Sequence, residues 1–402
     1  MRKQHLTSQS SPFKRSSPQH VKAKPTPTQG KIEPLPDFDW RTKQPVQFRP
    51  FKPKYHLTMG KEAFPISSPQ LWFRTYPPFP IPKKNANRRT NRRFNYLAVE
   101  RSSISELIEM DRNYLDRITW RQRIIRDHAA TVVGAHSAAA GPAIHEFYVW
   151  LLGTYLPTRF PRMFELVYPS PPSPATAEKG GSGSTATVRI MRSLVTGEEF
   201  GVEPPPADPV EALKVIGRLV DDDVQILTRE EDGDGYAMRG FVTCCPSGFD
   251  MSKKLGLKLR DIHTGVPGYK QKLEMSMDRF FDRLEVGTVV KRVNWAMNMN
   301  DDPFTPGGTK LYEGDEQPEM EIDIDQVHLR SERQVVHRLP KSGAIVFSFK
   351  TYLYPIKDIK AEGLGEELAT AIDGLKLGTV PQFHWYKKAP VWGEAVKGYL
   401  RS

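Results

Sequence analysis

The chain has 402 residues and is 38% hydrophobic, which is enough for one large core or two ordinary ones. Two adjacent cysteines, Cys244 and Cys245, are too few for a disulfide framework, a zinc site or an iron–sulfur cluster, and they favour a reducing, intracellular compartment. No apolar run approaches the roughly eighteen residues of a membrane-spanning helix, so we expect no membrane span. The formal net charge is +11.

This positive charge is concentrated at the start of the chain. Residues 1–93 contain 20 Lys or Arg and 4 Asp or Glu, whereas the remainder contains 38 and 43. The remainder is mildly acidic, so we expect no specific nucleic-acid binding from it. Residues 1–50 are predicted to form a disordered, basic Pro/Ser-rich tail, because they hold too few apolar residues to offset the entropy of ordering. A cytoplasmic location is expected, and the basic tail leaves a mitochondrial one open.

One domain is predicted over residues 51–402, and it begins with helices. Ser103 and Glu106 form a capping-box pattern, and apolar residues at helical spacing from Ile104 to Ile125 predict a helix behind it. Asp111 interrupts this apolar stripe. An acid at such a position lies either at the rim of the core or beside a buried partner.

Two further helices and two loops follow. Pro142 can begin the second helix, and Asp208 followed by Pro209 can cap and begin the third. Residues 169–187 are rich in Pro, Ser, Gly and Thr and predict a low-complexity loop, and residues 301–325 predict a mobile acidic loop.

Runs of β-branched and apolar residues predict the rest of the domain. The expected strands lie at 224–228, 238–245, 288–297, 326–336 and 344–352, with helices at 277–284 and 364–375. The predicted helices come first and a mostly antiparallel sheet with one interposed helix follows, which is an order typical of the α+β class. Cys244 and Cys245 should then be strand residues on opposite faces.

The stretch 244–268 combines a strand end, a basic segment and a histidine in a turn. Its cations are Lys253, Lys254, Lys258 and Arg260. His263 follows, just before the turn formers Gly265, Pro267 and Gly268. A neutral imidazole is a good axial ligand for iron, and nearby cations can pair with the carboxylates of an anionic cofactor. By spacing alone, an ordinary loop histidine beside a solvated basic face is the favoured interpretation.

The common catalytic signatures are absent from the sequence. Ser247 lies in Pro246-Ser247-Gly248, which is not a nucleophile elbow, and there is no glycine-rich dinucleotide motif or phosphate-binding loop. His128 and His145 lie on or beside predicted amphipathic helices and are interpreted as structural. No catalytic residue is therefore assigned.

Short motifs between about Tyr55 and Ile359 carry a resemblance to one family. They read KYHLTMG at 54–60, EMDRNY at 109–114, YLPTRFP at 155–161, PS at 246–247, IHTGVP at 262–267, RVNW at 292–295, RSERQ at 330–334 and RLP at 338–340. In number and order they resemble the α subunit of haem-dependent oxidative N-demethylase. One departure is Gly248-Phe249, where the family has a tryptophan after Pro-Ser.

The resemblance implies a PAS-like, haem-binding sheet with a b-type haem, and it assigns the iron ligand to His263. Arg292 and Arg333 would then pair with haem propionates, although structural ion pairs explain them equally well. Lys258 would lie near a propionate. Trp295 would line a pocket for a small amine, unless it is simply a core residue.

The implied activity is the oxidative N-dealkylation of a small amine with O2. The sequence has no flavin, nicotinamide or iron–sulfur motif, so electrons would come from a separate NAD(P)H-dependent flavin/iron–sulfur reductase. Two other functions stay open. One is a haem-binding sensor or carrier without turnover, and the other is a scaffold that binds polyanions through its basic tail.

Overall fold

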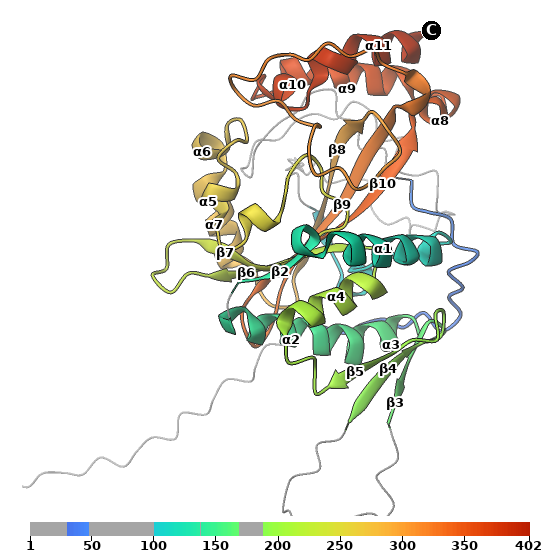
Figure 1. Ribbon diagram of the computed structural model, residues 1–402, viewed down its shortest axis with the longest axis vertical. Coiled ribbons are helices and arrows are strands. Elements are labelled where there is room, and N and C mark those ends of the chain that lie inside the picture. The colour runs from blue at the N-terminus through green and yellow to red at the C-terminus, as the bar shows by residue number, and fades with distance from the viewer. Residues whose placement is uncertain (1–29, 48–99, 137, 169–187) are drawn as a thin grey trace, which may run out of the picture.

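The computed structural model describes residues 30–47, 100–136, 138–168 and 188–402, which form a large antiparallel sheet with helices around it (Figure 1). The main sheet has the strand order β1-β8-β9-β10-β6-β7-β2. Its strands are β1 (Glu100–Ser102), β2 (Val133–Ala135), β6 (Asp223–Arg229), β7 (Tyr236–Val242), β8 (Val289–Asn298), β9 (His328–Arg338) and β10 (Ile345–Pro355). A smaller antiparallel sheet holds β3 (Phe164–Val167), β4 (Arg189–Ser193) and β5 (Glu199–Glu203). The predicted α+β class with a mostly antiparallel sheet is confirmed.

The helices fall into three groups along the chain. The first group is α1 (Tyr114–Val132), α2 (Gly141–Trp150), α3 (Leu156–Arg159) and α4 (Pro209–Leu219). The second, between β7 and β8, is α5 (Leu259–Ile262), α6 (Tyr269–Lys272) and α7 (Glu274–Arg283). The third follows β10 and contains α8 (Ile356–Ala361), α9 (Gly365–Leu377), α10 (Phe383–Tyr386) and α11 (Ala389–Arg401). None of the helices in the described ranges is long and apolar enough to cross a membrane.

The two faces of the main sheet are covered by different helix groups. Because side chains alternate along a strand, the sheet presents two separate apolar surfaces. One surface joins the core of α1, α2 and α4 through Val224, Ile226, Val335 and Val346. The opposite surface packs against α5 and α7 through Leu227, Val290 and Ile345. In Figure 1, α5, α6 and α7 accordingly lie together on one side of the strands.

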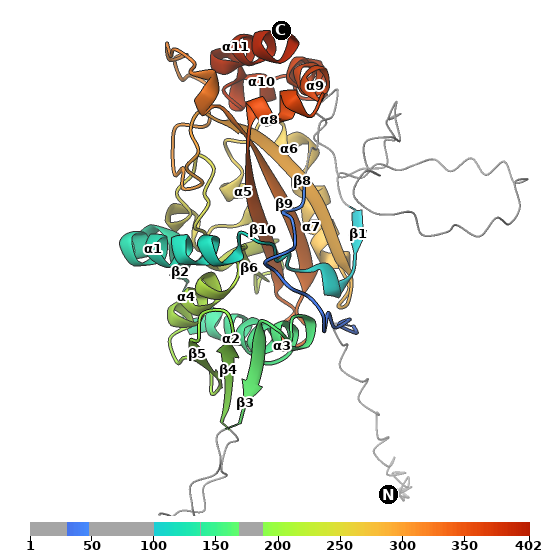
Figure 2. The same cartoon turned by 90° about the vertical axis from the view of Figure 1, so that its right-hand side faces the viewer.

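The third helix group caps one end of strands β8, β9 and β10 (Figure 2). This end has its own core, to which the strands contribute Trp295, Met297, Leu329, Tyr352 and Tyr354. Ile372 of α9 and Trp392 of α11 pack against them. The expected last helix at 364–375 thus matches α9, but it is one part of a larger helical cap.

Helix α4 forms as its sequence predicts. Asp208 has an extended backbone and its carboxylate accepts a hydrogen bond from the Val210 amide at 2.9 Å, while Pro209 occupies the first turn. The buried face of the helix includes Leu213 and Ile216. These signals are local, so the sequence was sufficient to place the helix.

The capping box predicted at Ser103 is wrong. Ser103 makes no side-chain cap, and only Ile104–Glu106 forms a short 3₁₀ turn before an irregular segment that reaches α1. The backbone carbonyls of this segment accept bonds from the sheet. Arg333 donates to the Leu107 oxygen at 3.2 Å, and Lys350 donates to the Glu109 oxygen at 3.0 Å. An α-helix would need these carbonyls for its own hydrogen bonds, so the tertiary contacts replace it.

The prediction that Cys244 and Cys245 are strand residues is also wrong, because β7 ends at Val242. Both cysteines are free and buried. Their amides donate to the two carboxylate oxygens of Asp223, each at 2.8 Å. These two hydrogen bonds replace those that the amides would make to a neighbouring strand, and the chain turns at this point.

Part of the predicted tail belongs to the folded structure. Trp40 is only 8% exposed and lies in the main core, with its ring 5.9 Å from that of Tyr114. The amide of Leu35 donates to the Arg159 oxygen at 2.9 Å. Residues 30–47 therefore contradict the disorder predicted for residues 1–50. The remaining tail residues and the predicted loop at 169–187 lie outside the described residues.

Candidate functional site

His263 follows α5 directly, on the side of the sheet that α5 and α7 cover. Its ring stacks on that of Tyr269, with centroids 4.4 Å apart and planes 7° from parallel. The ring nitrogen Nδ1 lies 2.7 Å from the backbone oxygen of Leu259. A carbonyl can only accept, so Nδ1 carries the proton and donates it. Turn geometry supports this placement, since Gly268 has a left-handed backbone (φ 71°) just before Tyr269.

The surroundings of His263 keep its imidazole neutral. Its pKa is lowered to about 4, chiefly by burial and also by the charges of Lys254, Arg292 and Lys310, against the opposing effect of the hydrogen bond to Leu259. In the neutral ring with Nδ1 protonated, Nε2 has a free lone pair. No residue in the described part of the chain donates a hydrogen bond to Nε2. His263 therefore has the tautomer that metal-binding histidines use, with the second nitrogen fixed by a carbonyl.

Arg292 lies on the same face of the sheet, in a polar row across β8 and β9. The register pairs Arg292 with Gln334 and Asn294 with Glu332, so Arg292 and Asn294 share a face. Arg292 donates from Nε to the Gln334 side-chain oxygen at 2.6 Å. Among the described residues it has no carboxylate partner, so its charge is not neutralised by an ion pair.

Glu332 lies in the same polar row, opposite Asn294, but its carboxylate already has partners. Burial opposes its ionisation, yet the charge of Arg330 and hydrogen bonds from Arg330 and Asn294 lower its pKa. Arg330 lies 3.1 Å away through Nε, and the Gln334 amide also donates to it at 3.0 Å. The cations around His263 therefore outnumber the available carboxylates.

Two further cations near His263 come from separate segments of the chain. Lys310 lies in the loop that the sequence predicts as acidic, and its ammonium nitrogen is 4.6 Å from the ring centroid of Phe249. Lys254 approaches the same ring at 4.8 Å. The sequence singled out Lys254 only as part of a basic segment and gave no role to Lys310. No local pattern indicates that these residues meet.

Three other predicted site residues lie in different surroundings. Arg333 donates to the backbone oxygens of Glu106 and Leu107, on the opposite face of the sheet from Arg292. Lys258 forms ion pairs with Asp232 at 3.4 Å and Asp234 at 2.9 Å.

Trp295 is buried in the core beneath the C-terminal helices, where the Lys387 ammonium lies 5.1 Å from its ring centroid. Of the other four predicted residues, only Arg292 lies on the same face of the sheet as His263 and is among the groups whose charge lowers the pKa of His263.

The residues around His263 would suit a cofactor in which the cofactor itself supplies most of the atoms that coordinate the iron. No group of three or more His, Cys, Asp or Glu side chains in the described residues could hold a metal ion alone. One neutral imidazole with a free Nε2 matches the single axial position of a porphyrin iron, and uncompensated cations beside it match porphyrin carboxylates. The residues present thus fit haem.

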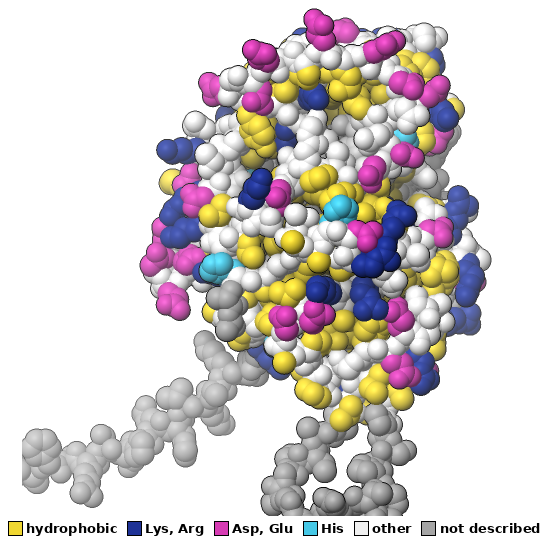
Figure 3. All heavy atoms as spheres, in the orientation of Figure 1, with side chains coloured by type: hydrophobic (Ala, Val, Ile, Leu, Met, Phe, Trp, Pro, Cys, Tyr) yellow, Lys and Arg dark blue, Asp and Glu magenta, His cyan; other side chains and the backbone are white. Residues whose placement is uncertain are grey.

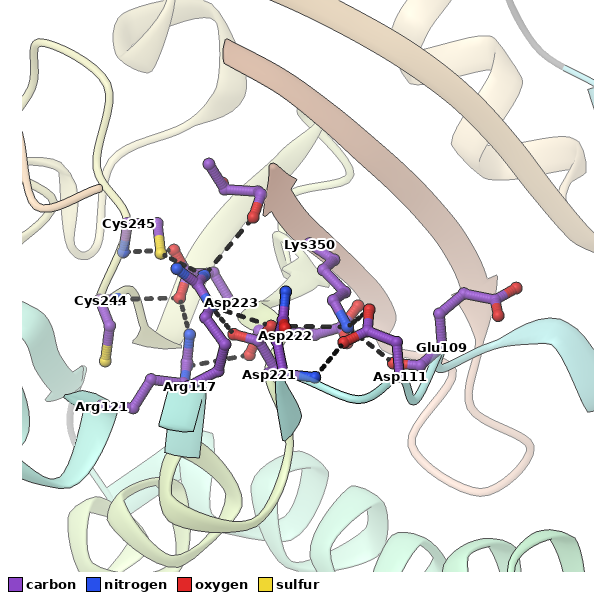
Figure 4. Close-up of polar contacts among 12 residues, drawn as sticks. Glu109, Asp111, Arg117, Arg121, Asp221, Asp222, Asp223, Cys244, Cys245 and Lys350 are labelled. Atoms are coloured by element: carbon purple, nitrogen blue, oxygen red, sulfur yellow. Dashed lines mark hydrogen bonds and ion pairs between the residues drawn. The ribbon is translucent and has the colours of Figure 1, made fainter. Parts of the chain in front are cut away.

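A second polar cluster lies on the far side of the sheet and is structural (Figure 4). Arg121 donates to Asp223 at 2.7 Å, and Arg117 donates to both oxygens of Asp221 at 3.0 and 3.1 Å. Lys350 lies 2.9 Å from Asp111 and 3.5 Å from Asp221. Lys350 is the buried partner that Asp111 needs in the core. Satisfied ion pairs of this kind fix how α1, β6 and β10 meet.

The surface of the described residues has two depressions that could hold a ligand. A groove of about 1010 Å³ runs between α1 and α4, and basic side chains gather there on the face seen in Figure 3. The cations that line it include Arg126, Lys214 and Arg218, and each has a carboxylate partner. A smaller pocket of about 270 Å³ is lined by Phe249, Phe304 and other residues. Only the smaller pocket shares a residue with the group around His263.

A neutral histidine and unpaired cations on one face of the sheet of an α+β protein are features that would suit an anionic, iron-containing ring. Comparison with known families agrees with these features. Residues 98–397 match the family described as haem-dependent oxidative N-demethylase, alpha subunit-like, and the chain belongs to this family.

Proposed function

We propose that this protein is a haem-dependent monooxygenase that oxidises the carbon next to the nitrogen of a small amine. The family supports haem-dependent oxidation. The observation that carries the assignment is the hydrogen bond from His263 Nδ1 to the Leu259 oxygen, because it leaves the lone pair of Nε2 free to bind iron. A b-type haem held in this way supplies O2 activation, and the resulting carbinolamine collapses to an amine and an aldehyde.

The chain's own residues would bind and orient the reactants. His263 would hold the iron, and Arg292 would donate to a propionate from the strand opposite. The pocket of about 270 Å³ next to Phe249 is large enough for a small amine and lies between α1 and the 304–306 segment. Electrons would come from a separate NAD(P)H-dependent flavin/iron–sulfur reductase, because the sequence carries no motif for a second redox cofactor.

The strand order supports a PAS-like interpretation of the domain. Strands β6 and β7, then helices α5 to α7, then β8, β9 and β10 give the sheet order β7-β6-β10-β9-β8. This is a five-stranded antiparallel sheet with its helices inserted after the second strand. A ligand between these helices and the sheet would contact His263 from one side and Arg292 from the other.

The test is the absorption spectrum of full-length protein expressed with a haem supply. A Soret band is expected in the wild type, and a pyridine haemochrome assay should identify haem b. His263→Ala should abolish or strongly shift the band, whereas His128→Ala and His145→Ala should not. Circular dichroism would establish that each variant is folded. An unchanged spectrum in folded His263→Ala would overturn the assignment, and O2 consumption with an added reductase separates turnover from mere haem binding.

A further inference from the structure

Lys254 and Lys310 place two ammonium groups against one aromatic ring. Their nitrogens lie 4.8 and 4.6 Å from the Phe249 ring centroid, and Lys310 is also 5.4 Å from that of Tyr386. A cation near an aromatic face gains about 0.5–2 kcal/mol. Two like charges sharing one ring repel each other, so the ring alone does not explain why both are there.

Neither lysine has a counter-ion among the residues that the structure describes. Lys254 makes one hydrogen bond, to the Ile262 oxygen at 3.4 Å, and forms no ion pair. Lys310 has no side-chain hydrogen bond and no ion pair, and its pKa falls to about 7 through burial and the charge of Lys254. Glu332 attracts Lys310 only from a distance and is already satisfied by Arg330.

Several other lysines in the described part of the chain have carboxylate partners. Lys258 pairs with two aspartates, Lys350 with Asp111 and Asp221, and Lys397 with Asp373 and Glu394. Burying an ammonium without a carboxylate costs free energy, so a site that holds two is suited to an anion that arrives from outside the described chain.

The backbone around Phe249 holds the two lysines in place. The Gly248 amide donates to the Thr305 oxygen at 2.7 Å, which ties the segment before Lys254 to the loop that carries Lys310. Gly248 has a left-handed backbone (φ 69°), and a Cβ there would lie 2.2 Å from the Thr309 hydroxyl and 3.2 Å from Cγ of Lys310. Only glycine permits this close approach. The pairing is therefore built by the fold rather than by two flexible surface chains.

We propose that Lys254 and Lys310, seated on Phe249, form a binding site for a carboxylate group beside His263. The ligand carboxylate is either a haem propionate or that of an N-methylated amino acid used as the amine substrate. Lys254 donates to the backbone oxygen of Ile262, the residue before His263, at 3.4 Å, so an anion bound by the two lysines would lie close to the candidate iron ligand. The propionate form of the proposal rests on the proposed function, but the carboxylate site itself does not.

Lysine-to-methionine variants test the site, because methionine keeps the apolar stem and removes the charge. Lys254→Met, Lys310→Met and the double variant should fold and be at least as stable as the wild type, since each removes a partly buried charge that has no ion-pair partner among the described residues. Lys258→Met is the matched control, because its charge is paired with aspartates in the same region. Thermal unfolding measures stability, and calorimetric titration of the full-length protein measures binding.

The probes are haem, haem dimethyl ester, acetate and N-methylglycine. If the site holds a propionate, haem affinity should fall about ten- to a hundredfold in the double variant, while affinity for the uncharged ester changes little. If it holds a substrate carboxylate, haem affinity stays the same and binding of N-methylglycine to haem-loaded protein is lost.

Acetate binding tests the carboxylate site independently of whether His263 binds haem iron. It should be detectable in haem-free wild type and absent in the double variant, even if His263 proves not to bind iron. Unchanged affinity for all four probes in a folded double variant would overturn the proposal, as would an equal loss in Lys258→Met.

Discussion

Asp222 is the acid whose replacement should stabilise the protein most. It lies 1% exposed before β6, and no described residue hydrogen-bonds to either of its carboxylate oxygens. Burial raises its pKa from 3.8 to about 7, Asp221 adds to this, and the charges of Arg333 and Lys350 only partly oppose it. Figure 4 shows it within the cluster of Arg117 and Lys350.

The sign of the effect follows from proton binding. Between about pH 4 and 7 the folded state keeps a proton on Asp222 that the unfolded state releases, so stability falls as pH rises through this window. A shift of about three pKa units corresponds to about 4 kcal/mol at about 1.36 kcal/mol per unit. Asp222→Asn mimics the protonated acid. It should match the wild type near pH 4 and exceed its stability by up to about 4 kcal/mol at pH 8.

Urea unfolding at a series of pH values measures this difference. Asp221→Asn is the matched control, because Arg117 and Lys350 lower the pKa of Asp221 against the effect of burial. It should be destabilised at pH 8, since removal of a buried partner leaves both cations less well paired. If Asp222→Asn is no more stable than the wild type at pH 8, or if its advantage does not shrink towards pH 4, the reasoning is refuted.

Three further outcomes are expected. Arg292→Lys should weaken haem binding about ten- to a hundredfold in a titration, because lysine keeps the charge but loses the planar fork of the guanidinium group. Unchanged haem affinity in both Arg292→Lys and Arg292→Ala would mean that Arg292 has only a structural role. Trp40→Ala should cost about 3 kcal/mol in urea unfolding, because a core ring is lost. Deleting residues 1–29 should leave the melting temperature within a few degrees of the wild type and weaken binding to heparin only in part, because 6 of the 20 Lys or Arg of residues 1–93 are removed; a large fall in melting temperature would contradict this.

Local sequence was enough to predict several elements and the turn that holds His263. Helix α4 follows from Asp208 and Pro209, because a cap acts on amides two residues away. Strands β8, β9 and β10 follow from runs of β-branched and apolar residues. His263 stood out because it lies among glycines and a proline that shape a turn within a few residues.

Only the tertiary structure decided which distant groups meet. Lys310 reaches Phe249 from a loop that its composition marks as acidic, and Arg333 lies away from Arg292 because the register pairs Arg292 with Gln334 instead. The same holds for the segment before α1, where Arg333 and Lys350 take carbonyls that a helix would have used. Capping and alternation are set by near neighbours, whereas a buried charge finds its partner only once the sheet has brought remote segments together.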